Sequence, residues 1–420
     1  MDLILSDGAQ EDKDIPHGWM KKKLGDCFSF LTTANYPRSD LSPYGEVMYL
    51  HYGDIHTRKS MFLDLQRDSL PYIAHEKVRK IPRLEDGDLV IADASEDYEG
   101  IGKAIEVRNA SSMKVVAGLH TLLLRAKKGE FADGFKAYIQ FIPSIKGSLI
   151  KAATGISVYG ISKGNLADID AVLPGLDEQK KIVHCLTDVE ALIENLEALI
   201  TKKKNIKQAA IQELFCPNAG WLEKKLGNTC ILKGRIGWQG LTTAEYLDSG
   251  DYRLVTGTDF LNGYIDWNHC HYVDESRYVQ DKNIQLKKND ILVTKDGTIG
   301  KVAIVDKLEK PATLNSGVFV IRPIDDAFHP GFMYHLLRSH IFSIFLDQLC
   351  AGSTINHLYQ KDFVNFTYPV PVTLLEQVSI ANSLSSMDEE IIALEAELEK
   401  IILIKKGILH ELLTGRIRLK

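Results

Sequence analysis

An internal repeat spans nearly all of the 420 residues of this chain. The opening string GWMKKKLG, residues 18–25, returns as GWLEKKLG, residues 220–227. Further matches follow in the same order: Asp88–Ile91 with Asp290–Val293, Gly102-Lys103 with Gly300-Lys301, Glu178-Gln179 with Glu376-Gln377, and Glu213-Leu214 with Glu411-Leu412. The separation changes only from 202 residues (221 − 19) to 198 (376 − 178), so the length differences are small. The pattern indicates a duplication and predicts two similar globular units related by an approximate twofold axis.

Each copy mixes strand and helix signals. Apolar β-type runs predict strands at 88–93 and 117–125 in the first copy and at 290–294 and 317–322 in the second. Helical spacing follows at 131–145 and 329–349, where Phe332, Leu336, Ile341, Phe345 and Leu349 form a candidate buried stripe. Because no regular alternation of strand and helix appears, we expect α+β domains.

A long helix closes each copy, at 177–214 and 375–413. The first carries apolar residues at Ile182, Leu186, Val189, Ile193, Leu196, Ile200, Ile206, Ala210 and Leu214. The second repeats the pattern from Ile380 to Leu412, and Gly415 follows it as a stop signal. Such a helix is about 55 Å long, and a single domain cannot bury so long a narrow stripe. We therefore expect the two helices to pack on each other in antiparallel fashion; the alternative is a pair of separate surface helices.

These signals divide the chain into four segments. We expect domain 1 at residues 1–175, a first spacer helix at 176–215, domain 2 at 216–373 and a second spacer helix at 374–420.

Composition limits the setting. Hydrophobic residues make up 45% of the chain and charged residues 25%, which is typical of globular proteins with real cores. No apolar run reaches the roughly 18–20 residues that span a bilayer, and the five acidic side chains among the first 15 residues do not fit a signal peptide. Six cysteines without a CxxC pair fit a reducing compartment, so we expect a cytoplasmic protein without membrane contact. The net charge of −6 restricts any nucleic-acid surface to local patches.

The repeated order of domain, Glu-Gln and long helix resembles the specificity (S) subunit of type I restriction–modification enzymes. The GW…LG openings, the segment DILVTKDGTIGK at 290–301, the loops at Thr154-Gly155 and Gly352-Ser353-Thr354, and the ending ELLTGR at 411–416 carry the resemblance. The first copy departs from the pattern, because Ala92–Glu99 replaces the compact loop Lys295–Thr298.

The resemblance implies a recognition subunit without catalytic activity. Two target-recognition domains would each read half of a bipartite, asymmetric site on double-stranded DNA, and the helices would set the distance between them. The partners would be two adenine-methyltransferase (M) subunits and motor–nuclease (R) subunits. S-adenosylmethionine, ATP and Mg²⁺ would then be bound by the partners, and no cofactor by this chain.

Catalytic motifs do not emerge from the sequence. The P-loop pattern fails, because the positions of its first glycine are Asp97 and Lys295. The Asn/Asp-Pro-Pro-Tyr string of adenine methyltransferases is missing, since the chain has no Pro-Pro. His269-Cys270-His271 has no second ligand pair at zinc-site spacing, so we expect no metal site.

We expect DNA contacts from turn-rich loops, where polar side chains can reach base edges and phosphates. The candidates in the first copy are Tyr36, Arg38, Arg58, Lys59, Ser95, Tyr98, Lys103, His120, Thr121, Thr154 and Ser157. The candidates in the second copy are Gln239, Thr242, Thr243, Lys295, Asp296, Thr298, Lys301, Asn315, Ser316, Ser353, Thr354, Asn356 and His357.

Two other classes stay open at this point. A coiled-coil scaffold with two protein-binding heads would share the helices and the near-neutral heads but would have no role on DNA. A stand-alone modification or cleavage enzyme would need the catalytic motifs that the sequence lacks.

Overall fold

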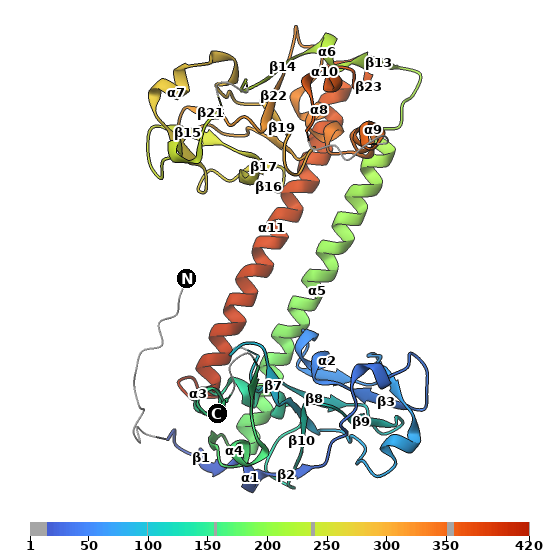
Figure 1. Cartoon of the computed structure of the whole chain (residues 1–420), viewed down its shortest axis with the longest axis vertical. Coiled ribbons are helices and arrows are strands. Elements are labelled where there is room, and N and C mark those ends of the chain that lie inside the picture. The colour runs from blue at the N-terminus through green and yellow to red at the C-terminus, as the bar shows by residue number, and fades with distance from the viewer. Residues whose placement is uncertain (1–14, 99, 155–157, 237–239, 351–356, 420) are drawn as a thin grey trace. The chain divides into compact units, whose positions relative to one another are not determined.

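The computed structural model describes residues 15–98, 100–154, 158–236, 240–350 and 357–419 (Figure 1). The chain divides into two compact units: unit 1 contains the chain up to Asn195 together with Leu398–Lys420, and unit 2 contains Leu196–Glu397. Each unit consists of one globular domain and a part of each long helix. Because this division cuts through the helices, the four-segment boundaries expected from sequence stay a prediction.

Domain 1, in unit 1, is built on a five-stranded sheet with the order β2-β10-β6-β8-β4. Its strands are β1 (Met20–Lys23), β2 (Phe28–Leu31), β3 (Val47–Leu50), β4 (Phe62–Asp64), β5 (Tyr72–Ile73), β6 (Leu89–Ala92), β7 (Ala94–Ser95), β8 (Ala104–Arg108), β9 (Val115–Ala117), β10 (Thr121–Ala126), β11 (Tyr159–Gly160) and β12 (Asp170–Leu173). Its helices are α1 (Leu24–Cys27), α2 (Tyr52–Thr57), α3 (Pro143–Ala152) and α4 (Lys163–Ala167). A second sheet has the order β5-β3-β9, and β1 pairs with β12.

Domain 2, in unit 2, is built on a four-stranded sheet with the order β14-β22-β19-β20. Its strands are β13 (Trp221–Lys225), β14 (Cys230–Gly234), β15 (Tyr252–Val255), β16 (Phe260–Leu261), β17 (Tyr264–Ile265), β18 (His271–Val273), β19 (Ile291–Thr294), β20 (Val302–Ile304), β21 (Ala312–Leu314), β22 (Val318–Pro323) and β23 (Thr367–Pro371). Its helices are α6 (Leu226–Thr229), α7 (Glu275–Val279), α8 (Pro330–Leu337), α9 (His340–Cys350) and α10 (Gln360–Phe363).

The two domains share one strand plan. The order β2-β10-β6-β8 of domain 1 corresponds to β14-β22-β19-β20 of domain 2, and β4 is an addition to the first sheet. Each domain also has a three-stranded sheet, β5-β3-β9 in domain 1 and β18-β15-β21 in domain 2. Each of these sheets contains one parallel pair, β3 with β9 and β15 with β21. Each domain also pairs its first strand with its last, β1 with β12 and β13 with β23. The expected α+β class and the internal duplication are therefore confirmed.

The two long helices are α5 (Leu176–Leu214) and α11 (Leu374–Leu413). Within unit 2, Lys203 pairs with Glu390 and Lys207 with Asp388, so residue numbers rise along α5 as they fall along α11. Within unit 1, Lys405 of α11 pairs with Glu190 of α5 at 2.9 Å, and Arg418, which follows α11, pairs with Glu178 near the start of α5 at 2.7 Å. The expected antiparallel packing is therefore present in each unit.

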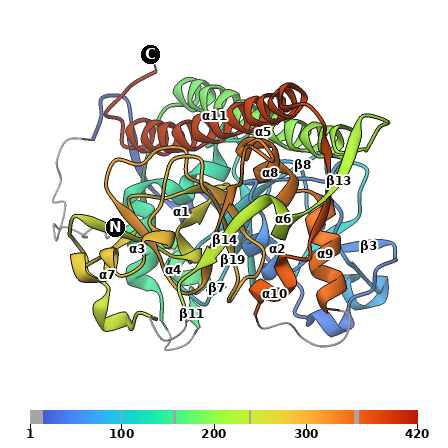
Figure 2. The same ribbon diagram turned by 90° about the horizontal axis from the view of Figure 1, so that it is seen from above.

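In unit 2, α8 lies between the helix pair and the larger sheet (Figure 2). Phe332 and Leu336 of α8 belong to the same buried cluster as Ile291 of β19 and Ile380 and Leu384 of α11. The apolar stripe of the long helix is therefore buried against its own domain as well as against the partner helix.

The repeated Glu-Gln pairs attach each long helix to its domain. The indole nitrogen of Trp19 donates to Glu178 at 2.9 Å, and that of Trp221 donates to Glu376 at 3.0 Å. Each glutamine is buried and joins the start of its helix to backbone groups of the domain. The Gln179 side chain accepts from the amide of Ala132 and donates to the carbonyl of Pro174. The Gln377 side chain accepts from the amide of His329 and donates to the carbonyl of Pro371. The motif that opens each helix is therefore an anchor.

Three helix predictions need correction. Residues 131–145 do not form one helix, because a 3₁₀ segment, η3 (Lys136–Phe141), precedes α3. Residues 329–349 are broken between α8 and α9 at Arg338 and Ser339. Ile206 was expected in the buried stripe of α5 but is 45% exposed. At about 100° per residue, Ile206 lies about 240° around the helix axis from the buried Ile200 and so faces away from the buried side. Ile211, eleven residues after Ile200, lies within about 20° of the Ile200 direction and is buried.

Candidate DNA interface

A corresponding loop in each domain joins two neighbouring strands of the larger sheet and borders a cleft. In domain 1 it joins β6 to β8, and in domain 2 it joins β19 to β20. Both loops end at a glycine with positive φ, +70° at Gly102 and +81° at Gly300. A Cβ atom would lie only 2.6 Å from Leu149 in the first case and 2.4 Å from Leu346 in the second. The positive φ therefore favours glycine at both positions, and a side chain there would also have to displace the neighbouring leucine.

The first cleft has a volume of about 1110 Å³ and is rich in cations. Arg58, Lys59, Lys103 and Lys146 line it, together with the acidic residues Glu96 and Asp97. Four of the residues expected from sequence meet here: Arg58, Lys59, Ser95 and Lys103. Local concentration of positive charge suits a phosphate backbone even though the chain as a whole is acidic.

The cations of this cleft differ in how many of their N–H groups remain available to hydrogen-bond a ligand. The Lys103 ammonium donates to the carbonyl oxygens of His56 at 2.7 Å and Arg58 at 2.9 Å, which leaves one of its three donors for a ligand. Burial lowers the pKa of Lys103. Arg58 pairs with Asp68 at 2.7 Å, whereas Lys59 is exposed.

Aromatic and imidazole rings lie beside the first cleft. The ring of Tyr52 contacts the rings of His51, His56 and His120. His120, with φ of +55° and half of its side chain exposed, contacts the Asp93 carboxylate at 3.2 Å. Burial raises the pKa of Asp93, and the neighbouring His120 offsets part of that effect. The sequence analysis did not predict Tyr52 and His56 as site residues. The turn signal Gly53-Asp54 between them could have identified this segment as a candidate loop.

The other candidates of domain 1 lie apart from the cleft lining. Tyr36 donates to Lys77 O at 3.2 Å, and Arg38 pairs with Asp54 at 2.6 Å. Tyr98 is 49% exposed and packs against Tyr159, and Thr154 is exposed. Thr121 is buried and bonded to Gly118 O, so its hydroxyl is not presented to a ligand in this conformation.

The second cleft has a volume of about 470 Å³ and is lined mainly by hydroxyl and amide groups. The predicted residues Asp296, Thr298, Lys301, Asn315 and Ser316 all line it. Lys301 is exposed and is the only cation among the described residues that line the cleft. Such a surface offers both hydrogen-bond donors and acceptors, which suits contacts with base edges.

Neighbouring side chains orient the polar groups of the second cleft. Asp296 pairs with His357, the Lys295 ammonium lies 5.0 Å from the centre of the Phe319 ring, and Asn315 donates to the Tyr246 hydroxyl. Burial lowers the pKa of Lys295. Thr242 forms a capping box with Glu245, and Thr243 next to it is exposed.

The sequence prediction missed Thr256, Thr258 and Tyr246 of this cleft. Thr256 and Asp259 form a capping box after β15, as His51 and Asp54 do after β3. An aspartate three residues after a cap residue, repeated in both copies, was the available signal. The candidates Ser157, Gln239, Ser353, Thr354 and Asn356 lie outside the described residues.

The described part of the chain contains no group of three or more His, Cys, Asp or Glu side chains placed to hold a metal ion. None of its helices is long and apolar enough to cross a membrane.

Comparison with known proteins gives a family match in both halves. The model of the family described as "Type I restriction modification DNA specificity domain" matches residues 16–207 and again residues 218–403. The type I restriction enzyme MjaVIII specificity subunit of Methanocaldococcus jannaschii is 26% identical over 325 residues, which cover 71% of this chain and 74% of the relative. The putative type I restriction enzyme MjaX specificity subunit of the same organism is 24% identical over 428 residues, covering 97% and 95%.

Two solved structures share the fold. The S subunit of a type I restriction–modification system from M. genitalium matches with a TM-score of 0.56 at 15% identity, over 94% of this chain and 96% of that one. A chain from a structure described as the basis of complex assembly and conformational transition of the type I R-M system matches with a TM-score of 0.57 at 18% identity, over 96% and 100%.

Proposed function

Because this chain belongs to the family of type I restriction–modification DNA specificity subunits, we propose that it reads a bipartite, asymmetric site on double-stranded DNA, one half-site per domain. The observation that carries this proposal is the pair of corresponding clefts with different chemistry. One is lined by four cations, and the other by hydroxyl and amide groups with a single lysine. Different donor and acceptor patterns favour different base sequences, so the two half-sites would differ.

We assign DNA contact to the exposed members of the two clefts and their rims, with Lys59 and His120 in domain 1 and Thr298 and Lys301 in domain 2 as the principal candidates. Buried cations such as Lys103 would shape the clefts and contribute charge. Phosphate contacts would supply most of the affinity, and the polar groups of the second cleft would contribute base discrimination.

The helix pair would act as the spacer between the two readers. The supporting observation is that α5 and α11 are long, uninterrupted helices cross-linked by ion pairs within each unit. Adding seven residues to both helices should lengthen the unread stretch of DNA or abolish binding. An unchanged spacer would mean that the helices do not set it.

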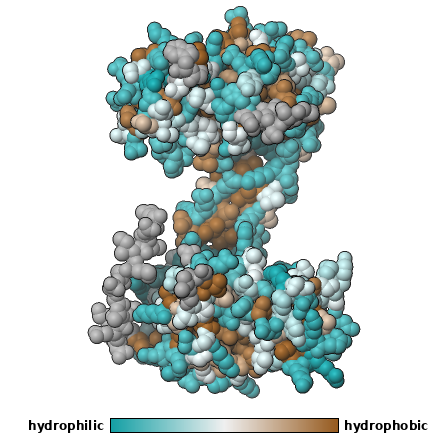
Figure 3. All heavy atoms as spheres, in the orientation of Figure 1, coloured by the Kyte–Doolittle hydropathy of each residue, from teal (hydrophilic) through white to brown (hydrophobic). Residues whose placement is uncertain are grey.

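We further propose that two methyltransferase subunits and a motor–nuclease subunit dock on this chain and bring S-adenosylmethionine, ATP and Mg²⁺, so that this subunit itself performs no chemistry. Apolar surface that remains on the helices supports docking (Figure 3). On α5 within unit 2, Leu199 is 38% exposed and Ile206 is 45% exposed, seven positions apart. That is the spacing at which one helix packs along another.

The test is genome-wide mapping of N6-methyladenine in strains with and without this gene. Loss of methylation at one bipartite motif would establish the function and reveal both half-sites. An unchanged methylation pattern, with the partner methyltransferase expressed, would contradict it and favour the scaffold alternative.

A further inference from the structure

Each unit contains a small polar cluster where its domain meets the helix pair. We call the residues Lys207, Tyr334, His335, Arg338, Ser385 and Asp388 joint 2, in unit 2, and the residues Tyr138, Thr187, Glu190 and Lys405 joint 1, in unit 1. Three pairs of positions are related by the same offset of 198: Thr187 with Ser385, Glu190 with Asp388, and Lys207 with Lys405. The duplication therefore places a carboxylate on one long helix opposite a lysine on the other in both units.

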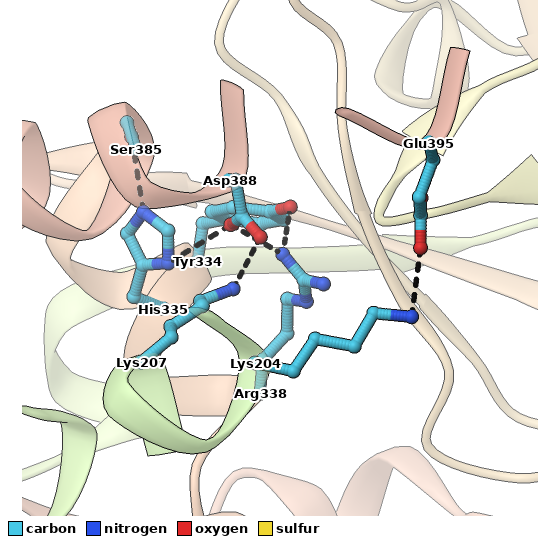
Figure 4. Close-up of polar contacts among 8 residues, drawn as sticks. All are labelled: Lys204, Lys207, Tyr334, His335, Arg338, Ser385, Asp388 and Glu395. Carbon is cyan, nitrogen blue, oxygen red and sulfur yellow. Dashed lines mark hydrogen bonds and ion pairs between the residues drawn. The ribbon is translucent and has the colours of Figure 1, made fainter. Parts of the chain in front are cut away.

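Asp388 of α11 lies at the centre of joint 2 (Figure 4). One of its oxygens pairs with Lys207 of α5, and the other lies 3.1 Å from Nη1 of Arg338, the residue that follows α8. The Asp388 side chain is only 9% exposed. A single carboxylate thus joins both long helices to the globular domain.

The charges of joint 2 depend on this carboxylate. Burial, with smaller effects of Lys207 and Arg338, lowers the pKa of His335 to about 3, so its ring is neutral near pH 7. The His335 Nε2 atom lies 3.0 Å from the Ser385 hydroxyl. Asp388 is the only acid in joint 2 and therefore balances two cations. Removal of a charge from such a buried network leaves the remaining charges uncompensated.

Joint 1 has the same plan with fewer members. The ammonium of Lys405 lies 2.9 Å from Glu190, and Tyr138 of the 3₁₀ segment η3 is fully buried. Burial, and to a smaller extent the Glu190 charge, raises the pKa of Tyr138. The positions one and four residues after the tyrosine are His335 and Arg338 in joint 2. In joint 1 the same positions are occupied by the buried apolar residues Ile139 and Ile142.

A short path of packed groups leads from joint 2 to the second cleft. The turn between β16 and β17 contains Gly263, where a Cβ atom would lie 2.2 Å from the Tyr334 hydroxyl and 2.8 Å from Arg338. The carbonyl of Gly263 accepts from the amide of Ile304 in β20 at 3.0 Å. Strand β20 begins directly after Lys301 of the cleft. A continuous series of contacts therefore connects Asp388 with the recognition loop of the second cleft.

We propose that Glu190 and Asp388 are positioning residues that fix each recognition domain on its part of the helix pair and so restrict the spacer length that the protein accepts. This inference rests on the proposed bipartite reading. Neither carboxylate lines a recognition cleft. Their loss should change how strictly the two half-sites must be spaced, while base preference within each half-site stays the same.

The test uses the full chain assembled with its methyltransferase subunits and DNA duplexes that carry the mapped motif with its natural spacer, one base pair fewer or one base pair more. The measured quantity is the ratio of affinities for the natural and altered spacers. Asp388→Asn should lower this ratio roughly tenfold, because a charge-assisted contact is lost, and Glu190→Gln should lower it less, because joint 1 has fewer charges to hold. Asp388→Glu, which installs the acid found in joint 1, should keep the ratio within about twofold of the wild type.

Duplexes with base substitutions inside the half-sites provide the control. The loss of affinity that each substitution causes should be the same in Asp388→Asn and in the wild type. An unchanged spacer ratio in Asp388→Asn would overturn the inference while leaving bipartite reading intact, whereas failure of the wild type to bind any bipartite motif would refute the proposed function itself. If Asp388→Asn does not assemble, Lys207→Gln serves instead, because Arg338 still pairs with Asp388. An unchanged ratio in that variant is equally decisive against the proposal.

Discussion

The two recognition domains use the same strand order with different cleft linings. Their larger sheets share four strands in the same order, and the cleft loops join corresponding strands. One cleft nevertheless has four cationic side chains in its lining and the other has one. Loop side chains are limited by few packing contacts, whereas sheet positions are limited by neighbours on every side. The comparison teaches that a duplicated scaffold can keep its geometry while its reading surface diverges.

A second contrast lies inside the sheets. Leu89 pairs with Glu106 in domain 1, and Ile291 pairs with Ile304 at the corresponding register position in domain 2. Glu106 is buried, forms an ion pair with Lys136 at 2.8 Å and accepts from the amides of Gly134 and Ala137. One domain thus holds its 3₁₀ segment η3 with a buried charge pair at a place where the other uses an apolar residue.

The largest effect is expected from exchanging residues 1–175 for the first domain of another family member. One half-site should change completely, because its reader has been replaced, and the other should stay the same. Mapping of N6-methyladenine measures both halves in one experiment. A change in both half-sites would show that the domains do not read independently.

Removal of the buried carboxylate should come next. Glu106→Ala leaves Lys136 buried without a partner and should destabilise domain 1 by about 3–5 kcal/mol. Ile304→Val at the corresponding position should cost domain 2 only about 0.5–1.5 kcal/mol. Hydrogen exchange of the β8 and β20 amides in each variant reports the two effects separately. Equal protection of β8 in Glu106→Ala and the wild type would show that the ion pair contributes little.

The ends of the two long helices offer a comparison that depends on pH. Arg418 makes two 2.7 Å hydrogen bonds to Glu178 and holds the pKa of that carboxyl below its usual value, with a smaller effect of Trp19. A carboxyl with a lowered pKa in the folded state stabilises above the unfolded value of about 4.3, and this contribution disappears as pH falls through the folded value. The segment that follows α11 should therefore become less stable as the pH falls below about 4.

Hydrogen exchange at Gly415–Leu419, measured across this pH range, tests the contact. Glu178→Gln should remove most of the pH dependence of these residues, and Glu376→Gln, which removes the acid that binds Trp221, is the matched control and should leave it in place. The same pH dependence in Glu178→Gln and the wild type would assign it to another group.

The smallest effect concerns single lysines of the clefts. Lys301→Ala removes an exposed cation and should reduce the slope of log Kd against log salt by about 1, with a similar loss of affinity for all sequences. Lys103→Ala should have a smaller effect on that slope, because two of its donors are engaged by backbone carbonyls, and should loosen the segment from His56 to Arg58. DNA affinities of both variants, measured over a range of salt concentrations, test this comparison. Equal slopes of log Kd against log salt in the two variants would show that exposure does not decide which lysine contacts phosphate.

Much of the candidate site follows from the sequence. The predicted residues Asp296, Thr298, Lys301, Asn315 and Ser316 line one cleft, because they lie next to β19 and β22, which are neighbours in the sheet. Tyr36 and Arg38 were predicted on the same grounds but do not line the first cleft. Turn composition shows that a loop is exposed, but the direction it faces depends on the sheet pairing.

The sequence by itself determined the duplication, the α+β class and the two long helices, because these depend on local periodicity and on strings that return at a fixed spacing. Only the tertiary structure decided which polar residues became structural. Lys207 and Asp388 lie 181 positions apart, and nothing in their local sequence distinguishes them from solvated charges on a helix surface. Glu106 lies in a run that reads as an ordinary strand, yet it forms a buried ion pair. Burial and long-range pairing result from packing of the whole chain, so the joints and the contrast between the clefts emerge only in three dimensions.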